Sequence, residues 1–172
     1  MASLIDNLID VVDKMSAEYE RLLALSLNKT PVIVAGDLDR LAVITEEEQL
    51  IVSKINKLDH TMQATLKDIA DVINKDVSEL DLAVIIGFMG PKPLEQQKLA
   101  VVYDKLKDVV QNVARVNLQN GELIKDALEM VQFEMNILQA QKAAPQTANY
   151  SKAAVSAGSV IGVNARGFDA RQ

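Results

Sequence analysis

The side chains that usually carry out catalysis are scarce in this chain of 172 residues. It has one histidine, His60, and no cysteine, which excludes thiolate catalysis, disulfide bonds and cysteine-ligated metals. A single histidine cannot supply the paired Glu-x-x-His motifs of a di-iron bundle, and no serine or threonine has a histidine or lysine placed to activate it. The glycines Gly87, Gly90 and Gly121 fit no phosphate-binding loop. We therefore expect no enzyme, no cofactor and no metal site, and we interpret His60 as a surface residue.

Two asparagines are the polar residues whose positions need an explanation. A heptad pattern that places Val116 and Leu123 at core positions also places Asn120 on the same seam, with Asn117 one turn before it. A buried amide on a seam penalises helices that pair out of alignment, whereas an exposed one could contact a bound helix. We favour the first reading and predict that Asn117 and Asn120 set the register of helix pairing.

The composition limits the classes of partner. The net charge of −6 argues against a protein that neutralises nucleic-acid phosphates and against a basic helix lying on a membrane surface. The longest uncharged apolar run, residues 82–89, is far shorter than the roughly 20 residues that cross a bilayer. Residues 1–10 carry no basic group ahead of their apolar residues, so we see no secretory signal. These features predict no nucleic-acid partner and no membrane insertion, and they are compatible with a cytoplasmic location.

Two long segments repeat apolar residues at alternating steps of three and four, which keeps one seam of a helix facing a partner. The first seam runs through Leu41, Ile44, Ile51, Ile55, Leu58, Met62, Ile69 and Val72. The second runs through Leu99, Val102, Leu106, Val109, Val113, Val116, Leu123, Ala127, Met130 and Ile137. They predict helices from about 38 to 74 and from Pro91 or Pro93 to about 142. The short connector makes the two antiparallel, and Gly121 inside the second marks a bend or a close contact.

Two shorter elements complete the predicted bundle. A first helix covers residues 2–28, and then either Thr30 caps a separate turn starting at Pro31, or the helix continues with a kink to Ala35. In both readings Gly36 and Asp37 form a corner, with Asp37 as the N-cap of the next helix.

The segment 75–92 predicts a short apolar helix, with Ser78, Glu79 and Leu80 as its cap and first turn and its end at Gly87. It either folds over the end of the bundle and closes it or forms an exposed apolar patch. We favour the first reading because soluble proteins seldom expose such a patch.

The predicted fold is all-α: an elongated antiparallel helical bundle or coiled coil of three main helices, with one short capping helix and a flexible C-terminal tail. We divide it into a helical bundle at 1–142 and a tail at 143–172. The tail is rich in Ala, Ser and Gly, and a segment of this kind is disordered by itself. It nevertheless carries spaced apolar anchors that would order against its own helices or a partner, among them Tyr150, Val160, Ile161 and Phe168. The pattern leaves open whether the long helices pair within one chain or in a homodimer.

The order of several short features resembles the FlgN-type flagellar export chaperones, over residues 1 to about 140. The features are Tyr-x-x-Leu-Leu at Tyr19 to Leu23, a basic residue at Lys29, the Gly36-Asp37 corner, Leu41 and Ile44, the acidic run Glu46 to Glu48, and Asn117, Asn120, Leu123 and Ile124. The resemblance implies a cytoplasmic chaperone that binds hook-associated proteins, which form the hook–filament junction. It would prevent their premature assembly and deliver them to the flagellar export apparatus.

The resemblance also implies that the client engages the C-terminal part of the chaperone. The end of the last helix presents Met130, Val131, Met135 and Leu138, and methionine is an adaptable residue for a surface that accepts helices. We predict that these four residues and the tail anchors Tyr150, Val160, Ile161 and Phe168 bind the partner. The alternative is a structural coiled-coil protein that acts through homo-oligomerisation and leaves its tail unused.

Overall fold

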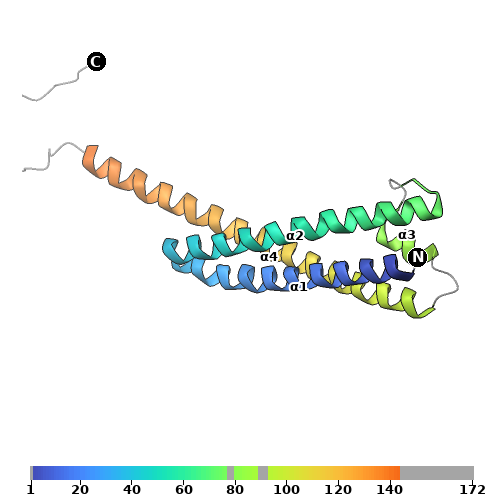
Figure 1. Cartoon of the computed structure of the whole chain (residues 1–172). Coiled ribbons are helices and arrows are strands. Elements are labelled where there is room, and N and C mark those ends of the chain that lie inside the picture. Colours follow the sequence, from blue (N-terminus) through green and yellow to red (C-terminus); the bar gives the residue numbers. More distant parts are fainter. Residues whose placement is uncertain (1, 77–79, 89–92, 144–172) are drawn as a thin grey trace, which may run out of the picture. The chain divides into compact units, whose positions relative to one another are not determined.

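The computed structural model describes residues 2–76, 80–88 and 93–143. Within these ranges the chain forms helices and no strands, as predicted: α1 (Ala2–Ala35), α2 (Leu38–Ile73), α3 (Leu82–Phe88) and α4 (Pro93–Ala143) (Figure 1). The contacts divide the chain into two compact units, Met1–Glu129 and Met130–Gln172, so that the division falls inside α4. The predicted division at 142/143 stays a prediction.

Helix α1 continues through Pro31 to Ala35, so the predicted end at residue 28 is wrong and the alternative reading is correct. A proline inside a helix removes one backbone hydrogen bond and costs about 3 kcal/mol. Val32 and Ile33, which follow it, are 5% and 7% exposed, and their burial offsets that cost. The helix ends at Ala35 and is followed by Gly36, whose left-handed φ of 66° forms the predicted corner.

The boundaries of α2 follow from local capping. The Oδ1 atom of Asp37 accepts a hydrogen bond from the backbone N–H of Arg40 at 3.0 Å, which confirms Asp37 as the N-cap. At the other end Asn74 is left-handed, with φ 53°, and its N–H donates to the carbonyl of Ala70. Because Gly36 and Asp37 form a tight corner, α1 and α2 are antiparallel neighbours (Figure 1).

The first unit has a core to which all four helices contribute. Its main cluster of buried residues is Ile5, Leu8, Val11, Val12 and Met15 of α1, Leu66, Ile69 and Ala70 of α2, Leu82 and Ile85 of α3, Leu99, Leu106 and Val109 of α4, and Leu80. Within this unit α4 runs parallel to α1, because Lys105 pairs with Asp13 and, further along both helices, Asn120 bonds to Ser26. It therefore runs antiparallel to α2, as predicted (Figure 1).

The first predicted seam is buried only in part. Ile55 and Ile69 are buried, and the intervening Leu58 and Met62 are half-buried. Val72, at the end of the seam, is 53% exposed, so its prediction as a core residue is wrong. The buried face passes instead through Ala70, and Ile73, the last residue of the helix, packs against the core.

Helix α3 closes one end of this core. The Oδ1 atom of Asp81 accepts from the N–H of Val84 at 2.7 Å and so provides the N-cap, whereas the predicted cap residues Ser78 and Glu79 lie outside the described residues. The apolar side chains of this segment that enter the core are Leu80, Leu82 and Ile85. The favoured prediction of a closing element is thus confirmed for these residues. Phe88 is 57% exposed, with Lys75 Nζ 3.8 Å from its ring centroid.

Gly121 lies in an uninterrupted stretch of α4. A Cβ atom placed on it would meet nothing within 4 Å, so the predicted close contact at this glycine is wrong. The helix continues because glycine lowers helix stability by only about 1 kcal/mol, which neighbouring residues offset.

Candidate partner-binding surface

Burial along α4 stops at a definite residue. Asn120 is its last buried residue, Leu123 and Ile124 are half-buried, and the described residues 125–142 are all exposed. Ala127, Met130 and Ile137, which the heptad spacing placed on the seam, are therefore not covered by the other described helices. The physical reason is the length of the neighbouring helix. Asn120 bonds to Thr30 of α1, and α1 ends at Ala35, about 7.5 Å further along its axis.

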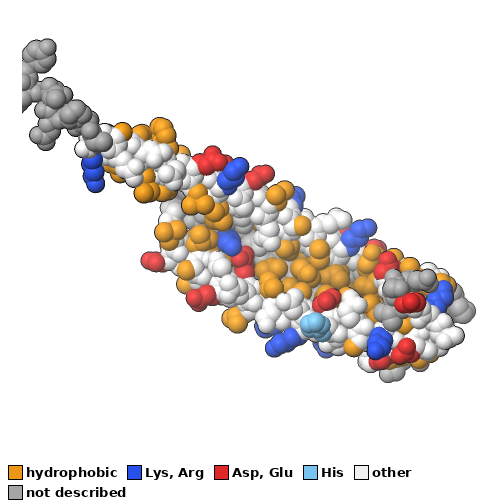
Figure 2. All heavy atoms as spheres, turned by 90° about the horizontal axis from the view of Figure 1, so that it is seen from above, with side chains coloured by type: hydrophobic (Ala, Val, Ile, Leu, Met, Phe, Trp, Pro, Cys, Tyr) orange, Lys and Arg blue, Asp and Glu red, His pale blue; other side chains and the backbone are white. Residues whose placement is uncertain are grey.

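The last turns of α4 present a concentrated set of exposed apolar side chains. The residues predicted to bind a partner are among them: Met130 (65% exposed), Val131 (52%), Met135 (48%) and Leu138 (56%). Sequence reasoning missed Leu128 and Phe133, which are 64% and 63% exposed. It placed Ile137 on the seam but did not name it as a binding residue, and Ile137 is 41% exposed. Figure 2 shows hydrophobic side chains on the surface of this segment, next to the atoms drawn in grey. The predicted tail residues Tyr150, Val160, Ile161 and Phe168 lie outside the described residues.

Just before this surface, Asn120 joins α4 to α1. Its side chain is 3% exposed, and its Nδ2 donates to the backbone carbonyl of Ser26 at 2.8 Å. Its Oδ1 accepts from the hydroxyl of Thr30 at 2.7 Å. Both ends of the buried amide are thus hydrogen-bonded, as buried polar groups in native proteins normally are. Thr30, which the sequence suggested as a helix cap, serves as this partner.

The hydroxyl of Ser26 extends the contact to α2. Its Oγ lies 3.2 Å from Glu48 Oε1 and 3.1 Å from Asn117 Oδ1, yet a hydroxyl has one proton and cannot donate to both. We assign the Asn117 amide in the opposite orientation, because its NH₂ group then donates to Ser26 while Ser26 donates to Glu48. The other carboxylate oxygen of Glu48 pairs with Lys29 Nζ at 2.7 Å, and these side chains are only 14% and 18% exposed.

We call Ser26, Lys29, Thr30, Glu48, Asn117 and Asn120 the three-helix polar network, because they belong to α1, α2 and α4. A small shift of α4 along α1 would break its hydrogen bonds and leave buried polar atoms unpaired. This geometry suits the predicted register role of Asn117 and Asn120, which stays a prediction.

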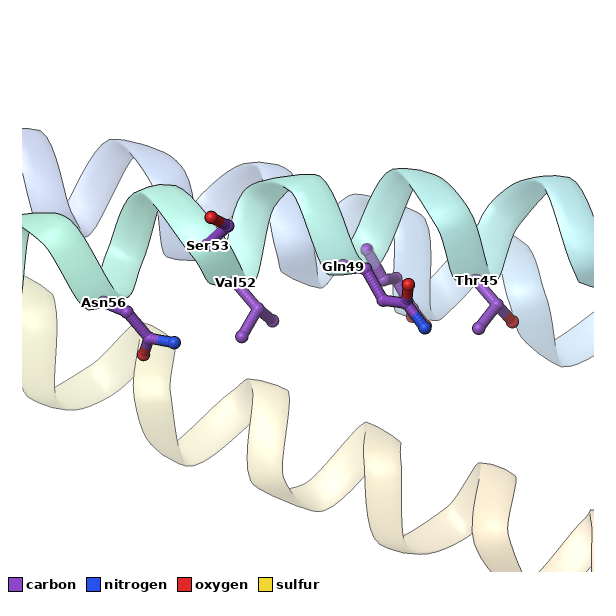
Figure 3. A pocket seen from close by; sticks show the side chains of 6 residues that line it. Thr45, Gln49, Val52, Ser53 and Asn56 are labelled. Carbon is purple, nitrogen blue, oxygen red and sulfur yellow. The ribbon is translucent and has the colours of Figure 1, made fainter.

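A shallow hollow of about 370 Å³ lies on α2 beside this network. Figure 3 shows Val52 and Asn56, two of its lining residues, pointing toward the neighbouring helix. The polar groups that line this hollow already have partners within the chain. The hydroxyl of Thr45 donates to the Leu41 carbonyl at 2.8 Å, and the carboxylate of Glu48 pairs with Lys29 in the three-helix polar network. The hollow thus places no activated nucleophile beside a base.

The described residues show no arrangement that would hold a metal. No group of three or more His, Cys, Asp or Glu side chains within 2–76, 80–88 and 93–143 is placed for that purpose. His60 is exposed on α2, as predicted. None of the helices in this part of the chain combines the length and apolar character needed to cross a membrane.

Comparison with known families decides the identity. The model of the FlgN protein family matches residues 1–157, nearly the whole chain. The chain belongs to the FlgN family. The match extends beyond the 1–140 region in which the sequence features were recognised. FlgN proteins are flagellar chaperones, not enzymes, and the helical bundle is consistent with this.

The chain is also similar to one curated protein along most of its length. The chain is 27% identical, over 146 residues, to a Bacillus subtilis (strain 168) protein whose name is "Uncharacterized protein YvyG". The alignment covers 84% of this chain and 85% of that protein. No solved structure matches the chain significantly.

Proposed function

We propose that this FlgN protein is a cytoplasmic export chaperone for hook-associated proteins, the components of the hook–filament junction. It holds their helical termini, prevents their assembly inside the cell and delivers them to the flagellar export apparatus. Membership of the FlgN family supports the class of function. The exposed apolar surface at the end of α4 supports the mode of binding.

The observation that carries this proposal is the contrast between the two parts of α4. Up to Asn120 the seam residues of α4 are buried, namely Leu99, Leu106, Val109, Val113 and Val116, whereas from Leu128 to Leu138 the large apolar side chains are exposed. Clusters of large exposed apolar side chains mark interaction sites. Two of them, Met130 and Met135, are unbranched thioethers that adapt to differently shaped partners. An amphipathic helix of a client would cover this surface.

The tail anchors have a place in the same proposal. Tyr150, Val160, Ile161 and Phe168 follow the α4 surface directly in sequence, and they fold against the client when it arrives or cover the surface when it is absent. Truncation after Lys142 would weaken client binding at least several-fold. If the truncated chain binds the client with unchanged affinity, the proposed contribution of the tail to client binding is refuted.

Binding to a purified hook-associated protein of the same organism, measured by calorimetry, tests the proposal. The variant Val131→Ser/Met135→Ser is expected to bind at least tenfold more weakly, because two buried apolar side chains contribute about 1.5–3 kcal/mol each. Gln132→Ser/Asn136→Ser is the matched control on the polar side of the same turns and should bind like the unmodified chain. Absence of binding by the unmodified chain would refute the proposed client.

Homo-oligomerisation is the second candidate, favoured by one feature. Ile124, Leu128, Val131, Met135 and Leu138 are spaced at alternating steps of four and three, as in coiled-coil pairs. Light scattering at micromolar concentration separates the two: a stable homodimer disrupted by Val131→Ser/Met135→Ser, without client binding, would favour a structural protein.

A further inference from the structure

The exposed end of α4 carries two apolar seams. The first seam is Ile124, Leu128, Val131, Met135 and Leu138, and the second seam is Met130, Phe133 and Ile137. At about 100° per residue the centres of the two seams lie about 150° apart around the helix. Glu134 and Gln141 lie between them on one side, and Lys125, Glu129 and Asn136 on the other. This end of α4 therefore has two separate apolar faces.

A single partner helix cannot cover both faces. In a two-helix contact the seam is formed by two positions of each heptad, and the remaining positions face solvent or further neighbours. The packed part of α4 gives an internal comparison, because Val113 lies in one cluster with Leu22 of α1 and Ile55 of α2. Where α4 is buried, it packs against two helices.

We propose that the end of α4 binds two helices of the same client, one on each seam. This inference rests on the proposed function, in which the client is a hook-associated protein. The client helices would each present an apolar stripe. Glu134, between the seams, favours a Lys or Arg on the client at that level.

Other occupants fit the two seams less well. A second copy that pairs its own α4 would bring one helix and cover one seam. The chain beyond α4 carries its large apolar residues at Tyr150, Val155, Val160, Ile161, Val163 and Phe168, interrupted by Gly158, Gly162 and Gly167. Because glycine disfavours helix, this composition does not favour a long helical seam in the segment.

Site-specific cross-linking of the full chain tests the inference, and the absence of native cysteine makes each introduced thiol unique. Val131→Cys probes the first seam, Phe133→Cys the second, and Asn136→Cys the polar side as the matched control. Each variant is labelled with a benzophenone maleimide and irradiated in complex with a purified hook-associated protein, and the cross-links are mapped by mass spectrometry.

The expected result is that positions 131 and 133 cross-link to two different helical segments of the client, each at least fivefold more efficiently than position 136. Cross-links from both positions to one segment would overturn the two-helix inference while leaving the proposed function intact. So would cross-links from position 133 to residues 144–172 or to a second copy. If the unlabelled chain forms no complex with the hook-associated protein, the proposed function is refuted, and this inference, which rests on it, is refuted as well.

Discussion

Replacing Asn120 with alanine tests the three-helix polar network most directly. The substitution removes the hydrogen bond from Nδ2 to the Ser26 carbonyl at 2.8 Å and the acceptor of the Thr30 hydroxyl at 2.7 Å. Each hydrogen bond contributes about 0.5–1.5 kcal/mol, and a buried polar group left without a partner costs about 1–3 kcal/mol. Thr30 keeps a longer contact of 3.4 Å to the Ser26 carbonyl, which limits the second cost. We expect Asn120→Ala to lower the free energy of unfolding by about 2–4 kcal/mol.

Urea unfolding at 25 °C, followed by far-UV circular dichroism, measures this change. The control is Asn112→Ala, an exposed asparagine on the same helix, which should shift the stability by less than about 0.5 kcal/mol. A loss below about 0.5 kcal/mol for Asn120→Ala as well would refute the reasoning, because the network would then contribute nothing measurable.

A second variant separates a register role from a purely stabilising one. Asn120→Leu restores apolar burial at the seam, so it should recover part of the stability lost in the alanine variant. If the amide sets the register, the leucine variant should form additional oligomeric species in light scattering, because nothing then penalises misaligned pairing. A leucine variant with one unchanged oligomeric state would contradict the register role of Asn120.

Three further predictions concern stability, each measured by urea unfolding. Gly121→Ala should stabilise the chain by up to about 1 kcal/mol, because alanine favours helix and its Cβ meets nothing within 4 Å; destabilisation would show a contact absent from the structure. Lys29→Met should lower the free energy of unfolding by about 1–3 kcal/mol, because it leaves the mostly buried Glu48 carboxylate without its cation. Lys29→Arg should lower it less, because the cation is kept. Equal losses of stability in the two variants would argue against the ion pair. Ile85→Ala should lower the free energy of unfolding by about 2–4 kcal/mol, because it leaves a cavity in the core. Phe88→Ala, at an exposed position, should lower it by less than about 1 kcal/mol. Similar losses of stability in the two variants would contradict the closing role of α3.

Local chemistry made much of the fold predictable. Gly36 and Asp37 were identified as a helix stop and an N-cap because these roles depend on the conformation and the hydrogen bonds of neighbouring residues alone. The antiparallel order of α2 and α4 followed from short connectors. Pro31 is the instructive exception. Its local preference argues for a break, and the helix continues because the burial of Val32 and Ile33 in the folded chain offsets that preference.

The candidate surface was predictable only in part, for a related reason. Met130, Val131, Met135 and Leu138 were found because their types suit a binding helix, whereas Phe133 lies off the main seam and was missed. Ile137 was placed on the seam and was not named as a binding residue, although it is exposed. The apolar spacing is the same before and after Asn120, so no residue pattern shows where burial stops.

The sequence by itself therefore determined that this FlgN protein is an α-helical bundle, that Gly36 and Asp37 form the corner between its first two long helices, and which faces are apolar. These properties depend on short-range preferences and on the period of the helix. Only the tertiary structure decided which apolar faces are covered. Because α1 ends at Ala35, soon after its contact with Asn120, the same seam is core before that level and exposed surface beyond it.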